Sequence, residues 1–173
     1  MSETVLDSII AGVLEDLKPE QEAKPDLTEE LNTIPPALDV FKYFDSERIN
    51  VIAEVKRSSP SKGNLARIES PAQLAKEYEL GGAWAISVLT EGRRFNGSIS
   101  DFKAVRKEAE IPMLRKDFIV NEYQVKQTRA MGADLQLLIV AALSANQLKD
   151  LYLLGSHLGM TTLVEVHDEI GRA

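Results

Sequence analysis

The chain has 173 residues, of which 44% are hydrophobic, and this length suffices for one sizeable core. Its formal net charge of −7 disfavours a nucleic-acid-binding surface, and no apolar run approaches the roughly 20 residues of a membrane-spanning helix. The absence of cysteine excludes disulfides and thiolate sites, and two histidines are too few for a histidine-rich metal cluster. Because the N-terminus lacks the basic-then-apolar pattern of a signal peptide, we expect a cytoplasmic protein.

Residues 1–46 are expected to form a helical extension and linker ahead of a main domain over residues 47–173. An apolar stripe at four-residue spacing predicts an amphipathic packing helix over residues 3–17. Residues 18–36 are polar and end in two prolines, which is typical of a linker. A short helix is predicted over residues 37–44.

From residue 47 onward, strand-like and helical segments alternate. The expected strands are residues 49–55, 84–90, 111–118, 135–142 and 161–167. The expected helices between these strands begin after four N-cap residues, Ser70, Ser98, Asn121 and Ser144. Gln73 and Gln147 complete capping boxes with Ser70 and Ser144. This alternation predicts an α/β fold with a parallel sheet, either doubly wound or part of a (β/α)8 barrel. Neither the dinucleotide nor the P-loop glycine motif follows the first strand.

Charged side chains lie late in three of the expected strands: Glu54, Lys56, Lys116 and Glu165. In parallel α/β folds, ligands bind at the edge where the strands end. Each residue alone fits an ordinary ion pair or a solvated charge. Together they place acids and bases at one edge, which is the arrangement that general acid–base chemistry requires.

Two loops after these strands suit ligand binding. The loop "RSSPSKGNL" offers hydroxyls and backbone N–H groups that can bind an anion, although the same residues mark any loop. The loop "EGRRFNGS" carries Phe95, which is either a core residue or an aromatic wall for a ring-shaped ligand.

Five segments, in order, resemble the indole-3-glycerol phosphate synthase family: "IAEVKRSSPSKG", "SVLTEGRRFNGS", "PMLRKDFIV", "GADLQLLIVAAL" and "LGMTTLVEVH". The resemblance implies a (β/α)8 barrel. It also implies ring closure, decarboxylation and dehydration of 1-(2-carboxyphenylamino)-1-deoxyribulose 5-phosphate, without a cofactor or metal. The first helix resembles the family's extra N-terminal segment, which packs over the barrel mouth.

The resemblance also implies a role for individual residues. Lys116 is the general acid and Glu165 the general base, while Lys56 meets the substrate carboxylate and Glu54 holds the lysines in place. The implied substrate-binding residues are Ser59 near the phosphate, Phe95 and Phe118 around the anthranilate ring, Leu137 as an apolar wall, and Asn96.

The family's later motifs, including its main phosphate cradle, are not found in this sequence, which accounts for about five β/α units. We therefore expect a C-terminally incomplete barrel that is inactive alone and can self-associate through exposed strand edges. Two alternatives remain open. One is a non-catalytic half-barrel that binds phosphate or assembles with a partner, and the other is an aldolase-like barrel with Lys116 as a Schiff base. The expected partner is a phosphorylated small molecule, not nucleic acid or a membrane.

Overall fold

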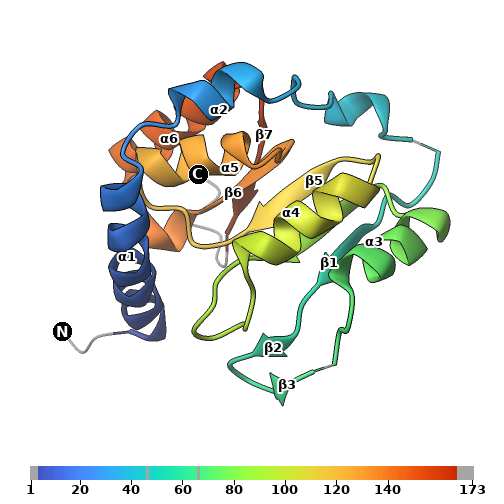
Figure 1. Cartoon of the computed structure of the whole chain (residues 1–173), viewed down its shortest axis with the longest axis horizontal. Coiled ribbons are helices and arrows are strands. Elements are labelled where there is room, and N and C mark those ends of the chain that lie inside the picture. Colours follow the sequence, from blue (N-terminus) through green and yellow to red (C-terminus); the bar gives the residue numbers. More distant parts are fainter. Residues whose placement is uncertain (1–3, 46, 66, 167–173) are drawn as a thin grey trace.

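The computed structural model describes residues 4–45, 47–65 and 67–166, and its centre is one parallel sheet (Figure 1). The strands lie in the order β1-β4-β5-β6-β7. Their bounds are β1 Ile52–Val55, β4 Ala85–Leu89, β5 Met113–Lys116, β6 Leu135–Ile139 and β7 Thr161–Glu165. Neighbours in space are thus neighbours in the chain, without the reversal of a doubly wound sheet. This is the strand order of a (β/α)8 barrel, so the predicted partial barrel is confirmed.

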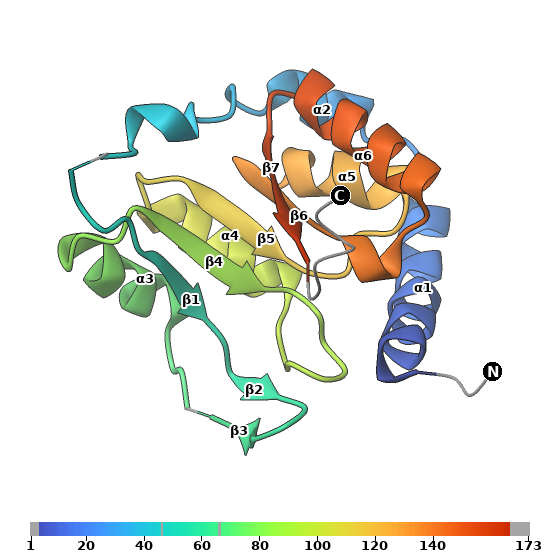
Figure 2. The ribbon, with the colours of Figure 1, turned by 180° about the vertical axis from the view of Figure 1, so that it is seen from behind.

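The four helices that follow β1, β4, β5 and β6 cover one face of the sheet. They are α3 (Pro71–Leu80), α4 (Ile99–Glu108), α5 (Glu122–Ala130) and α6 (Ala145–His157). In Figure 1 α4 lies in front of β4 and β5, and in Figure 2 it lies behind them. Each predicted N-cap side chain accepts a hydrogen bond from the backbone three residues on. Of the two predicted capping boxes, the one at Ser144 forms and the one at Ser70 does not, because the Gln73 side chain donates to Glu77 instead.

Apolar side chains form two separate layers, one on each face of the sheet. Between sheet and helices, a large cluster contains the fully buried Phe102, Ile86 and Met113. On the opposite face, a smaller cluster of Val40, Leu114, Leu135, Leu137 and Ile139 fills the interior of the partial barrel. This second layer supports the side chains that emerge at the carboxyl ends of the strands.

The N-terminal segment is more helical than the sequence predicts. α1 spans Val5–Ala23 and continues through Pro19, and α2 (Thr28–Thr33) lies inside the expected linker. The linker prediction over residues 18–36 is therefore wrong. The cause is packing, because Leu17 and Leu27 are buried against Tyr123 of α5, whose hydroxyl donates to the Lys24 carbonyl at 3.0 Å.

Two further differences concern short elements. The helix predicted over residues 37–44 shrinks to a 3-10 turn, η1 (Val40–Lys42), which begins at Asp39 and buries Val40 in the barrel interior. The serine-rich loop after β1 contains a small hairpin, β2 (Ser58–Ser59) with β3 (Gly63–Asn64), which the sequence did not predict. The predicted strands are longer than the observed ones; β6 passes into a second 3-10 turn, η2 (Val140–Ala142). His167, the end of the last predicted strand, lies outside the described residues.

The two outer strands of the described sheet, β1 and β7, are partly exposed. Val51 is 50% exposed just before β1, and Val164 is 44% exposed in β7. Within the described ranges, every helix is too short or too polar to cross a bilayer. The domain boundary expected at residue 46 stays a prediction.

Candidate active site

The four predicted catalytic side chains gather at the carboxyl ends of the strands. Strand register pairs Glu54 with Ser87, Lys116 with Leu89, and Glu165 with Ile139, all on the interior face of the sheet. Side chains alternate along a strand, so Lys56 lies on the same face as Glu54. A small cavity of about 70 Å³ is lined by Glu54, Lys56, Leu89, Phe95, Lys116, Asp117, Phe118 and Ile139. The sequence prediction did not include Leu89, Asp117 and Ile139.

Two ion pairs form at this edge. Lys56 Nζ contacts Glu54 Oε1, and Lys116 Nζ donates to Glu165 Oε2 at 3.0 Å. The four side chains are between 28% and 33% exposed, so water and a small ligand can reach them. The Lys116–Glu165 pair joins β5 to β7 across β6 and places an acid beside a base. This geometry can deliver a proton to one atom of a ligand and accept a proton from a nearby atom.

An aromatic surface stands next to the two ion pairs. The rings of Phe95 and Phe118 lie with centroids 6.1 Å apart and planes tilted by 38°. Phe95 belongs to the tight turn after β4, where the buried carboxylate of Glu91 accepts hydrogen bonds from the backbone N–H groups of Arg93, Arg94 and Phe95. The sequence analysis missed Glu91, although an acid at the start of a glycine-containing turn is a recognisable signal.

Three predicted substrate-binding residues do not line this cavity. Leu137 is 1% exposed and belongs to the apolar layer in the barrel interior. Ser59 lies in the β2–β3 hairpin, where its Oγ accepts from the Lys62 backbone N–H at 3.3 Å. Asn96 adopts a positive φ of 53° in the turn after β4 and supports the shape of that turn. Their contact with substrate stays a prediction.

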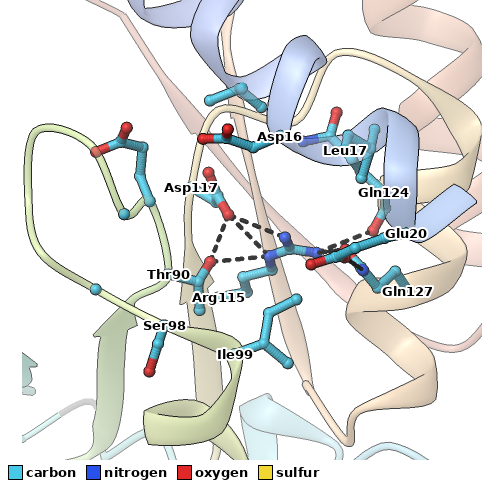
Figure 3. Close-up of a pocket in the computed structure, with 14 residues that line it drawn as sticks. Asp16, Leu17, Glu20, Thr90, Ser98, Ile99, Arg115, Asp117, Gln124 and Gln127 are labelled. Atoms are coloured by element: carbon cyan, nitrogen blue, oxygen red, sulfur yellow. Dashed lines mark hydrogen bonds and ion pairs between the residues drawn. The ribbon is translucent and has the colours of Figure 1, made fainter.

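A larger cavity of about 260 Å³ lies on the helix side of the same strand ends, beneath α1 (Figure 3). Residues from α1, the loops after β4 and β5, and α5 surround it. Arg115 and Asp117, the neighbours of Lys116 in the chain, point into this region and are 3% and 5% exposed. Sequence reasoning did not assign a role to either of them.

Helix α1 is fixed to the turn that carries Phe95. The Arg93 guanidinium lies over Gly12 and donates to Asp16 at 2.7 and 2.8 Å and to Glu15 at 2.9 Å. The hydrogen bonds from Arg93 hold the pKa of Asp16 below its usual value. The first helix therefore contacts a loop at the mouth of the partial barrel, as the resemblance implied.

Comparison with known proteins decides the family. The family model of indole-3-glycerol phosphate synthase matches residues 6–171. The chain belongs to this family. A relative named indole-3-glycerol phosphate synthase from Nocardioides sp. is 54% identical over 168 residues, which is 96% of this chain and 65% of the relative. Relatives of the same name from Mycolicibacterium gilvum and Mycolicibacterium smegmatis are 56% and 53% identical over 97% of the chain. The chain spans 62–65% of the length of these relatives.

Proposed function

We propose that this chain carries the acid–base pair and the aromatic wall of an indole-3-glycerol phosphate synthase active site. The observation that carries the proposal is the contact of Lys116 with Glu165 at 3.0 Å, beside Phe95 and Phe118, in a chain of this family. The substrate is 1-(2-carboxyphenylamino)-1-deoxyribulose 5-phosphate, as the family resemblance implies.

Each role follows from the chemistry of the step. The anthranilate ring carbon is a weak nucleophile, so the ribulose carbonyl oxygen needs a proton donor, and Lys116 supplies it. Carbon dioxide leaves from the ring, and Glu165 accepts a ring proton as the aromatic indole forms. Lys56 meets the substrate carboxylate, and Glu54, which contacts Lys56, holds this lysine in place. Either lysine can serve as the acid in the final loss of water.

The remaining predicted residues bind rather than react. Phe95 and Phe118 form an apolar surface on which an anthranilate ring can stack. Ser59 and the backbone of its hairpin offer donors for the phosphate, with Asn96 and Leu137 as further binding residues. A phosphorylated small molecule is therefore the proposed partner, and the cytoplasm is the proposed location.

A second candidate is a half-barrel that binds phosphate or assembles through its strand edges without catalysing. The exposure of Val51 and Val164 at the outer strands of the described sheet favours it. Under this candidate the chain alone binds substrate and forms no product.

Binding and turnover are measured together to test both candidates. Titration of the chain with the fluorescent substrate should give saturable binding, which Phe118→Ala weakens because the aromatic surface is lost. Product is followed by indole fluorescence in the same samples. Saturable binding without product supports the second candidate for the chain alone, and Lys116-dependent product supports a complete site. Absence of saturable binding contradicts the proposed substrate.

A further inference from the structure

Arg115 and Asp117, the residues on either side of Lys116, form a buried polar cluster with Thr90 beneath helix α1 (Figure 3). Thr90, Arg115 and Asp117 are 8%, 3% and 5% exposed. The proposed acid–base chemistry uses none of them. Burying a charged pair is expensive, so a cluster of this kind needs a physical reason.

Arg115 ties strand β5 to helix α5. Its Nη1 donates to Gln127 Oε1 at 2.9 Å and to Thr128 Oγ1 at 3.1 Å. Its Nη2 donates to Asp117 Oδ2 at 2.9 Å, and its Nε donates to Thr90 Oγ1 at 3.0 Å. The rigid, planar guanidinium therefore fixes three elements relative to one another.

Asp117 and Thr90 fix the backbone around Lys116 itself. Asp117 Oδ1 accepts from the Phe118 backbone N–H at 2.8 Å, and Asp117 Oδ2 accepts from the Thr90 hydroxyl. The Thr90 backbone N–H donates to the Lys116 carbonyl at 3.1 Å. Thr90 thus holds both the peptide of Lys116 and the side chain of the next residue.

Arg115 and Thr90 of this network lie outside the 70 Å³ cavity, while Asp117 borders it, and the network acts on the other residues that line it. Lys116 and Phe118 alternate with Arg115 and Asp117, so anchoring one face sets the position of the other. The hydrogen bond between Lys116 and Glu165 is 3.0 Å long, and a backbone shift of about 0.5 Å or more brings it to the limit of hydrogen-bond distance. A buried ion pair often adds little to the free energy of folding. A buried network in which every polar group is hydrogen-bonded does restrict the positions of its members.

We infer that Thr90, Arg115 and Asp117 are positioning residues, which hold the Lys116 amine against Glu165 and the Phe118 ring beside Phe95. The inference rests on the proposed role of Lys116. Its test uses the position of the Lys116 amine, not turnover, so the proposed function and this inference can fail separately.

The test compares two isosteric substitutions in the full chain. Thr90→Val removes the hydroxyl that accepts from Arg115 and donates to Asp117, and it leaves the direct Arg115–Asp117 ion pair in place. Thr162→Val is the matched control, because it removes a hydroxyl that accepts from the buried Gln136 at 2.9 Å rather than from Arg115. Trace acetylation with acetic anhydride, followed by peptide mass spectrometry, measures the labelling rate of Lys116 relative to the exposed Lys149. Thermal unfolding of each variant reports its stability.

Thr90→Val should raise the Lys116 to Lys149 labelling ratio about 3-fold, since an amine released from its hydrogen bond to Glu165 is open to the reagent more often. Thr162→Val should lower the melting temperature without changing the ratio, and Thr90→Ser should restore the wild-type ratio. An unchanged ratio in a folded Thr90→Val chain overturns the inference. If Thr90→Val does not fold, Gln127→Met, which removes an acceptor of Arg115, takes its place with the same two outcomes.

Discussion

Gly97 ends the turn that carries Phe95, and its replacement by alanine tests how tightly that turn is built. A Cβ at Gly97 would lie 2.3 Å from the Leu89 carbonyl oxygen and 2.6 Å from the Leu89 carbonyl carbon. Both are backbone atoms at the end of β4, so no side chain can rotate away. Gly92, at the start of the same turn, is the control, because its Cβ would lie 3.7 Å from the nearest atom, the Gly97 carbonyl oxygen.

The expected loss in unfolding free energy follows from the distance that the turn must move to relieve the clash. Ordinary Cβ contacts start at 3.4 Å, so the turn must move by about 1 Å relative to β4. Overpacking of this kind costs about 2–3 kcal/mol. For a chain of 173 residues, each kcal/mol lowers the melting temperature by about 2–4 °C, which gives a fall of roughly 4–12 °C. Gly92→Ala should leave the melting temperature unchanged or raise it slightly.

Circular dichroism of both variants during heating measures these shifts. Substrate titration adds a second reading, because movement of the turn displaces Phe95 from Phe118 and weakens binding of the anthranilate ring. Equal melting temperatures for Gly97→Ala and Gly92→Ala would refute the reasoning, since they would show that the turn relaxes without cost.

Two other predictions concern α1 and the serine-rich hairpin. Arg93 lowers the pKa of Asp16, so this pair stabilises the folded state above the unfolded pKa of about 3.9, and the contribution is lost as pH falls through the folded pKa. Asp16→Asn should therefore slightly reduce the fall in the urea midpoint between about pH 5 and about pH 3; the change is small because solvent screens this exposed pair. A wild-type acid dependence in this variant would contradict the assignment. Ser59→Ala should weaken substrate binding, measured by the fluorescence titration, while binding of anthranilate alone stays unchanged; equal loss for both ligands would place Ser59 away from the phosphate.

Local patterns in the sequence predict the repeating part of the fold well. Alternation of apolar strands with capped helices gives the parallel sheet, because each helix start has its own side-chain signal at Ser98, Asn121 or Ser144. Local patterns do not predict the helices between residues 18 and 36, because Leu27 is buried by Tyr123, which is distant in the chain. Propensity is overridden there by tertiary packing.

The candidate site shows the same division. Alternation along strands places Glu54 and Lys56 on one face, so their proximity was predictable. The Thr90–Arg115–Asp117 cluster was not predictable, because its bonds join strand ends to α5. The sequence analysis assigned no role to Arg115 and Asp117, and only the position of α5 and α1 shows that they are buried.

The most direct test of the account is the contribution of Lys116 to turnover. The experiment uses a fusion of this chain with the segment of the Nocardioides relative that lies outside the region of similarity. Formation of indole-3-glycerol phosphate by the fusion is followed by fluorescence. We predict that the fusion forms product and that Lys116→Ala lowers kcat by roughly 10²–10⁴-fold, the usual contribution of a proton-transfer group. An unchanged kcat in the Lys116→Ala fusion would contradict the central claim that this lysine is the general acid.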